Sequence, residues 1–157
     1  MAANGLMYKV SFDNIPLTAV AQDIWEFVAG ATVGFLIHSI RFTVSPTIVS
    51  GVPQDVRPQL RQAVRSTTGS GGSARTPRPT NPRNTVAAVT TTTSYVTTPG
   101  TIGNVWDADI VSVIVPYERI YTPDQRIFVP AATRWVLNLE ASIGTLSASS
   151  TVEFEEL

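Results

Sequence analysis

The sequence predicts an all-β fold: a β-sandwich of the jelly-roll type, with eight or nine strands and one long extended arm. Three observations lead to this prediction. Apolar and polar residues alternate with a period of two, Thr and Val are abundant, and Gly, Pro and Asn mark turns between the alternating stretches. The 157 residues are enough to bury a core, so we expect a single domain, 1–157.

The alternation places the expected strands along the chain. Tyr8, Val10 and Phe12 share one face of an early strand, and Trp135 and Leu137 share one face of a late strand. We expect these residues in the core. The predicted strands lie near 6–12, 17–28, 34–44, 58–67, 85–96, 108–116, 126–129, 133–141 and 146–155.

Two of these stretches have particular features. Residues 55–66 also fit an amphipathic helix, because Val56, Leu60 and Val64 fall on one helical stripe. We favour a strand there because its neighbours are predicted strands. The continuous Val and Ile run within 108–116 is typical of a central strand that is covered on both faces.

The charge of the chain is low and unevenly distributed. Charged residues make up 15%, below the usual share of about 25%. Either part of the surface meets another protein, or Thr, Ser and Asn supply the polar surface. No acidic residue lies between Asp55 and Asp107, and Arg is favoured at protein interfaces. We therefore predict partner binding by the arginines of this segment and two of its prolines: Arg57, Arg61, Arg65, Arg75, Arg78, Arg83, Pro77 and Pro79.

The expected arm is the segment 67–84. Its first half is rich in Gly and Ser, and its second half holds Pro77, Pro79 and Pro82. We expect it to lack strand structure, to be mobile in the free protein and to become ordered on a partner protein. A solvated loop is the alternative. The arm has neither Lys nor aromatic residues, so we predict no nucleic-acid binding.

Residues able to carry catalysis are scarce. The chain has no Cys, and its only histidine, His38, is expected to pack on the apolar face of its strand. Asp107 and Asp109 could bind calcium, but solvated acids at the start of a strand are the simpler interpretation. Trp106, near a predicted turn, is a candidate for a surface role. We predict no enzyme activity, no catalytic or metal-binding residues and no cofactor.

The sequence also has no sign of a membrane or secretory segment. No stretch approaches the roughly 18 apolar residues of a membrane span. The opening residues carry no basic run followed by an apolar region, so we expect synthesis in a cytoplasm and no membrane partner.

Three stretches resemble the jelly-roll capsid decoration, or cement, proteins of tailed bacteriophages. They are the opening Met-Ala-Ala-Asn-Gly-Leu-Met-Tyr, the arm with Gly-Gly-Ser and Thr-Pro-Arg-Pro-Thr-Asn-Pro, and the closing Thr-Val-Glu-Phe-Glu-Glu-Leu. These stretches lie at the start, in the middle and at the end of the chain, so the resemblance extends over its whole length. It implies homotrimers on the outside of a shell of major capsid protein, with arms that reach neighbouring subunits, and it implies no catalytic residues.

The expected function is therefore that of a virion structural protein. It would be made in the host cytoplasm and would bind the capsid surface, where it stabilises the lattice. The alternative is a receptor- or carbohydrate-binding β-sandwich module associated with a phage tail or fibre.

Overall fold

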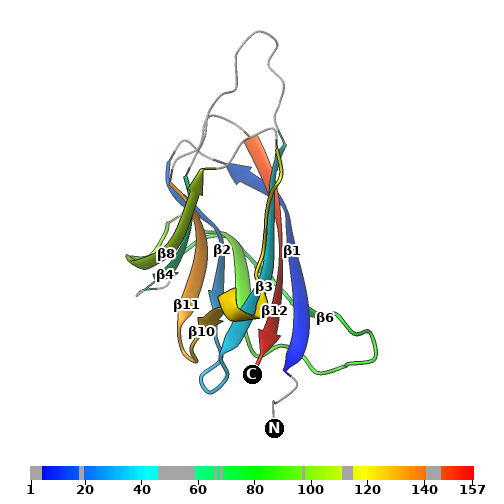
Figure 1. Cartoon of the computed structure of the whole chain (residues 1–157). Coiled ribbons are helices and arrows are strands. Elements are labelled where there is room, and N and C mark those ends of the chain that lie inside the picture. The colour runs from blue at the N-terminus through cyan, green and yellow to red at the C-terminus, as the bar shows by residue number, and fades with distance from the viewer. Residues whose placement is uncertain are drawn as a thin grey trace.

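Strands with alternating apolar and polar residues assemble into two antiparallel sheets that face each other in a β-sandwich (Figure 1). The computed structural model describes residues 5–17, 20–45, 59–65, 67, 69–96, 98–110, 115–140 and 146–157. Each of the two sheets contains six strands within this part of the chain. The predicted all-β sandwich is confirmed.

The first sheet is built around three long strands. In spatial order it contains β10 (Ile127–Val129), β3 (Phe35–Ser45), β12 (Leu146–Glu156), β1 (Leu6–Leu17) and β6 (Arg78–Pro79), and β9 (Tyr117–Ile120) also pairs with β3. A short 3₁₀ helix, η1 (Pro123–Gln125), lies between β9 and β10 in the chain. Strand β1 begins and β12 ends at the same end of this sheet, where Leu6 is the register partner of Glu156 (Figure 1).

The second sheet covers the inner face of the first. In spatial order it contains β5 (Ser73–Arg75), β7 (Thr91–Val96), β2 (Gln22–Val28), β11 (Arg134–Leu139), β4 (Gln59–Arg65) and β8 (Ile102–Ile110). Strands β5 and β8 therefore lie at opposite edges of this sheet. Strand β4 confirms the prediction of a strand rather than a helix for the described part of 58–67.

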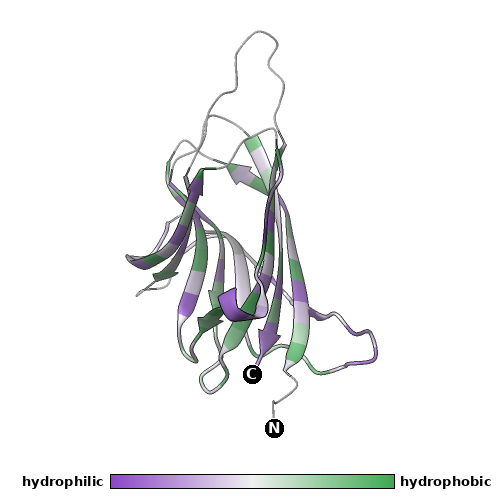
Figure 2. Cartoon of the chain, viewed as in Figure 1, coloured by the Kyte–Doolittle hydropathy of each residue, from purple (hydrophilic) through white to green (hydrophobic). Residues whose placement is uncertain are grey.

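The core lies between the sheets and is rich in aromatic rings. Phe27 of β2 contacts Phe154 of β12 edge to face, with ring centroids 5.4 Å apart, and also contacts Trp25 and Phe12. Edge-to-face pairs add to the stabilisation that burial alone provides. The predicted core positions Tyr8, Val10, Phe12, Trp135 and Leu137 are all buried, as the alternation required. Figure 2 shows hydrophilic and hydrophobic residues alternating along the strands.

A short polar chain crosses this apolar core. The Trp25 indole Nε1 donates a hydrogen bond to Ser150 Oγ at 3.1 Å, and Ser150 Oγ donates to the Arg41 carbonyl at 2.9 Å. Trp25 belongs to the second sheet, whereas Ser150 and Arg41 belong to the first. The bond therefore joins the sheets directly and satisfies polar groups that burial would otherwise penalise.

Bulges change the phase of two predicted strands. In β1, Asn14 adopts a positive φ of 53° at a bulge, so the strand predicted near 6–12 continues to Leu17. In β3, the pairing with β12 shifts at His38 and Ser39. One inserted residue reverses the side-chain direction, and the predicted packing of His38 on the apolar face is wrong: its ring contacts Glu155 and is partly exposed.

The described ends of the predicted strand at 108–116 do not form a central strand. The strand observed is β8, 102–110, and it lies at the edge of the second sheet rather than at its centre. Val115 lies in a bend and is 63% exposed, while 111–114 lie outside the described residues. A continuous apolar run is compatible with burial on two faces, but only the order of the strands decides which strand is central.

Candidate functional site: a cationic groove beside the arm

The arm, residues 67–84, is paired with both sheets. Strand β5 pairs with β7 in the second sheet, and β6 pairs with β1 in the first. The Thr80 amide also donates to the Met7 carbonyl at 3.0 Å. The expectation that the arm lacks strand structure is therefore wrong, because its backbone groups satisfy open edges of both sheets.

Local sequence chemistry explains how the arm makes this crossing. Gly71 and Gly72, with φ of 83° and 90°, form the turn before β5 in a backbone region that glycine tolerates best. Pro77 is buried at the point where the chain leaves the second sheet for the first. A proline has no amide hydrogen for a ladder, so it suits the break between two edge strands.

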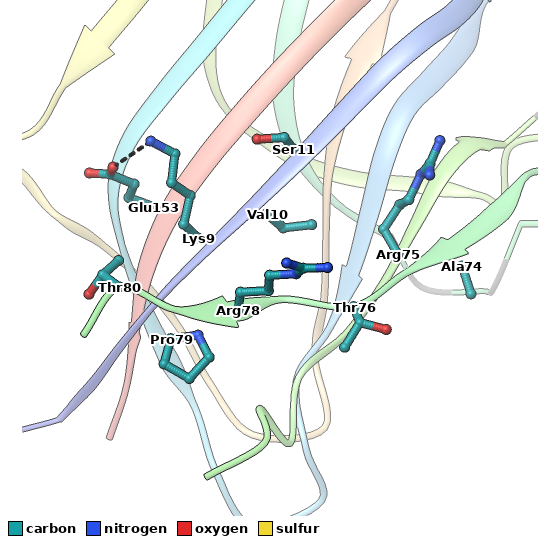
Figure 3. A pocket seen from close by; sticks show the side chains of 10 residues that line it. All are labelled: Lys9, Val10, Ser11, Ala74, Arg75, Thr76, Arg78, Pro79, Thr80 and Glu153. Carbon is teal, nitrogen blue, oxygen red and sulfur yellow. Dashed lines mark ion pairs between the residues drawn. The ribbon is translucent and has the colours of Figure 1, made fainter. Parts of the chain in front are cut away.

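A groove of about 810 Å³ lies between the arm and β1 (Figure 3). We call it the arm groove. The residues that line it are Lys9, Val10, Ser11, Ala74, Arg75, Thr76, Arg78, Pro79, Thr80 and Glu153. They come from β5 at the edge of the second sheet, from the outer face of the first sheet, and from the middle of the arm.

The charge of the arm groove is only partly compensated. Lys9 Nζ lies 3.3 Å from Glu153 Oε1, and an Arg75 guanidinium nitrogen lies 3.3 Å from Asp13 Oδ1. Arg78 has no ion-pair partner within the described part of the chain. Arg78 is also the register partner of Lys9, and two like charges directly opposite each other on neighbouring strands disfavour pairing. An anionic group in the groove would relieve this repulsion.

The structure separates the arginines that the sequence grouped. Arg75 and Arg78 line the arm groove together with Pro79, whereas Pro77 is buried beside it. Arg83 is exposed in the turn at 81–84, where its amide donates to Asn81 Oδ1, and it does not line the groove.

The remaining predicted arginines belong elsewhere. Arg61 and Arg65 lie in β4, which is on the far side of β2 and β11 from β5. Arg57 lies outside the described residues. The described members of the predicted arginine set therefore do not form a single surface.

Sequence reasoning missed the contribution of β1 and β12 to the groove. Lys9 is the only lysine in the chain and alternates with core residues, which places it on an outer strand face. Its pairing with Glu153 depends on the register of β1 and β12, which are more than a hundred residues apart in the sequence. No local pattern in the sequence carries that information.

A second, smaller groove of about 410 Å³ adjoins the first on the outer face of the first sheet. The two grooves share Lys9 and Glu153. The second also contains His38, whose Nε2 lies 3.0 Å from Glu155 Oε2. The outer face of this sheet is thus a polar surface that carries the ion pair of Lys9 with Glu153 and the contact of His38 with Glu155.

The far edge of the second sheet has a different character. Trp106 of β8 is 59% exposed and contacts the buried Trp135 edge to face, with centroids 5.8 Å apart. Asp109 accepts a hydrogen bond from the Tyr117 hydroxyl at 2.9 Å, and Asp107 lies 3.7 Å from the Arg119 guanidinium. Burial and this hydrogen bond raise the pKa of Tyr117, so its hydroxyl stays protonated and continues to donate to higher pH than that of a free tyrosine.

Among the described residues, no three His, Cys, Asp or Glu side chains are grouped to hold a metal ion, and no helix there is long and apolar enough to cross a membrane. Comparison with protein-family models, curated proteins and solved structures gives no match. The class defined by the fold and the groove is an antiparallel β-sandwich with a cationic surface groove.

Proposed function

We propose that this chain is a virion structural protein that binds the outside of a tailed-phage capsid and stabilises the shell lattice, as decoration or cement proteins do. Its partner in this role is the major capsid protein, and it acts as a homo-oligomer, with a trimer as the expected state. The observation that carries the proposal is the arm groove, where Arg78 lies in register with Lys9 and, unlike Lys9, has no carboxylate partner among the described residues.

The order of the strands supports this interpretation. Successive strands β1, β2, β3 and β4 alternate between the two sheets, and so do β11 and β12. The principal orders are β3-β12-β1 in one sheet and β2-β11-β4-β8 in the other. Jelly-roll chains alternate between two sheets in this manner, and both viral capsid domains and lectins use that architecture. We therefore propose a jelly roll with an arm inserted between β4 and β8.

The groove supplies a physical mechanism for lattice binding. Arg78 can form a charge-assisted, bidentate contact with a carboxylate of an acidic segment, and the paired arm holds it in position before binding. Preorganisation lowers the entropy lost on association. A modest contact of this kind becomes strong when several linked copies bind one lattice at the same time.

The test is made on particles purified from the natural source of the chain. Mass spectrometry should detect the chain in a fixed ratio to the shell protein. Recombinant wild-type protein should rebind particles from which the chain has been stripped, and Arg78→Glu should weaken rebinding about tenfold or more, since one charge-assisted contact is replaced by repulsion. Arg83→Glu is the matched control, because Arg83 is exposed in the same arm but does not line the groove.

Absence of the chain from purified particles would refute the proposed function. Equal rebinding by the two charge-reversal variants would instead refute the role of the groove. Binding that weakens with added salt for wild type, and less so for Arg78→Glu, would support it.

Trp106 gives a specific reason to retain the alternative, a receptor- or carbohydrate-binding module. Its indole is 59% exposed on a strand that also carries Asp107 and Asp109. Sugars stack on exposed aromatic rings while neighbouring polar groups bond their hydroxyls, so a glycan array would detect this function directly. Specific retention that Trp106→Ala abolishes would favour the alternative.

A further inference from the structure

The outer face of the first sheet carries charged side chains that no ion pair engages. They line the second groove, the cavity of about 410 Å³ that adjoins the arm groove. Lys9 in this groove is paired with Glu153, and His38 contacts Glu155. Among the described residues, three further charged side chains of the groove have no ion-pair partner: Arg41, Arg126 and Glu118.

Strand pairing sets the positions of two of these side chains. Strand β9 pairs with β3 so that Glu118 lies opposite Arg41 and Ile120 lies opposite Ser39. The intervening Arg119 contacts a carboxylate of the second sheet, so Glu118 and Ile120 face outward by alternation. The outer face of β9 therefore presents a carboxylate and an apolar side chain to the groove.

Arg126 lies at the other end of the same row. It directly precedes β10, which pairs with β3 up to Ile37, whereas β9 pairs with β3 from Ser39 onward. Along this side of β3, Ile120 therefore lies between Glu118 and Arg126, and it is 70% exposed. The groove thus has an apolar side chain with a carboxylate on one side and a guanidinium on the other.

The guanidinium of Arg126 also has an unused hydrogen-bond donor. Its Nε is buried and has no hydrogen-bond partner among the described residues. Buried polar groups nearly always have a partner, because an unsatisfied donor costs free energy. A guanidinium only donates, and it forms its strongest contacts with carboxylates in a bidentate geometry. Arg126 is therefore the position in the groove that suits a carboxylate of a ligand.

We propose that the second groove binds a saccharide that carries a carboxylate, such as a uronic acid. The carboxylate pairs with Arg126, an apolar face of the sugar ring covers Ile120, and sugar hydroxyls donate to Glu118. The hydroxyls of Ser39 and Thr151 also line the groove. The site goes beyond the proposed function, because it involves no residue of the arm.

The charges of the groove favour this ligand over simpler ones. Two arginines and one glutamate leave one positive charge in excess among the side chains without ion pairs. An inorganic dianion is attracted by the arginines but repelled by Glu118, which as a carboxylate only accepts hydrogen bonds. A neutral sugar satisfies Glu118 and leaves the arginines without a counter-charge. An acidic sugar supplies both one negative charge and hydroxyl donors.

The test is a titration of the isotope-labelled full chain, followed by nuclear magnetic resonance, with sodium glucuronate, glucose and sodium sulfate at one ionic strength. Glucuronate should give saturable shifts of the amide signals of β9 and of Arg126. Glucose and sulfate should each bind about tenfold more weakly or less, because each supplies only part of the contacts. Sulfate that binds as tightly as glucuronate would show a simple anion site and overturn the proposal. So would the absence of saturable shifts with glucuronate up to tens of millimolar.

Three variants test the charged side chains. Arg126→Gln should weaken glucuronate binding about tenfold or more and should change glucose binding little. Arg41→Gln should weaken glucuronate binding in the same direction, and this exposed residue can be replaced without disturbing the core. Glu118→Ala should reduce the preference for glucuronate over sulfate, because it removes an acceptor for sugar hydroxyls. Unchanged glucuronate binding by both arginine variants would overturn the proposal.

Two control variants locate the site. Arg83→Gln is the matched control for Arg126→Gln, because Arg83 is exposed and does not line the second groove. Trp106→Ala changes the indole on β8 of the second sheet, away from this groove. Both should bind glucuronate as wild type does. Binding that Trp106→Ala abolishes and Arg126→Gln leaves intact would place the saccharide at β8 and overturn the proposal.

Particle binding separates this site from the proposed function. Arg126 lies beside β10, at the opposite edge of the first sheet from β6, so Arg126→Gln should rebind stripped particles as wild type does. Loss of rebinding would assign the second groove to the shell contact and overturn the saccharide site. Absence of the chain from particles, together with saturable glucuronate binding, would refute the proposed function and support the saccharide site.

Discussion

Replacing two buried tryptophans in turn would measure the polar connection between the sheets. Trp25 and Trp135 are 0% and 1% exposed and lie on neighbouring strands of the second sheet. Trp25 Nε1 donates to Ser150 Oγ across the core, whereas Trp135 Nε1 is buried without a partner among the described residues. Substitution by Phe removes the same atoms at both positions, so much of the lost apolar contact is common to both variants.

The difference in the free energy of unfolding between the two variants reports on the hydrogen bonding of the two indole N–H groups. Trp25→Phe loses a bond whose net contribution to the free energy of unfolding is about 0.5–1.5 kcal/mol, whereas Trp135→Phe removes an N–H group that is already unpaired. Relief of that unpaired donor offsets part of the cavity cost at position 135. We therefore expect Trp25→Phe to destabilise the protein by about 1–3 kcal/mol more than Trp135→Phe. At this chain length each kcal/mol corresponds to about 2–4 °C in Tm.

Urea denaturation followed by far-ultraviolet circular dichroism is the suitable assay, because it does not depend on the tryptophans that are changed. Ser150→Ala serves as the second arm of a double-mutant cycle with Trp25→Phe. The cycle should give a coupling free energy of about 1 kcal/mol, and the corresponding cycle with Trp135→Phe should give none. Equal destabilisation by the two Phe variants, or no coupling to Ser150, would refute the reasoning.

The other predictions concern a buried carboxylate, a tyrosine and the arm. Glu156 accepts two hydrogen bonds from backbone amides of the segment before β7, so Glu156→Gln should lower the free energy of unfolding by about 1–3 kcal/mol, and hydrogen exchange should show those amides opening faster. Burial, followed by the hydrogen bond to Asp109, raises the pKa of Tyr117 above the unfolded value of about 10. Above that pH the unfolded state binds fewer protons than the native state, so stability falls as pH rises, and Tyr117→Phe should make this fall shallower in urea titrations between about pH 10 and 12. Trypsin should cleave after Arg83, in a turn, faster than after Arg75, in β5, and equal rates would show that β5 opens as readily as the turn.

The fold class and much of the core follow from the sequence. Alternation along Tyr8, Val10 and Phe12, and again along 146–155, identifies inward faces because a strand turns successive side chains to opposite sides. Trp135 was predicted in the core by the same pattern and is buried. These predictions succeed because they depend only on local periodicity.

Bulges and strand order depend on tertiary pairing instead. The bulge at His38 reverses the direction of one side chain, and nothing in the local sequence marks the inserted residue. The apolar run at 108–116 predicted a central strand, yet its described residues 108–110 belong to β8, at the edge of the second sheet. Both differences arise because pairing with distant strands decides which residues are exposed.

The candidate site was predictable only in part for the same reason. Composition alone identified Arg75, Arg78 and Pro79 as a basic, proline-containing segment, and these residues do line the arm groove. Composition also grouped them with Arg61 and Arg65, which the fold places in β4. Charge along a chain is a local property, whereas a binding surface forms where the register of separate strands brings side chains together. The sequence determined that this protein is a β-sandwich with a basic arm, and the pairing of β6 with β1 decided that its cations meet in one groove.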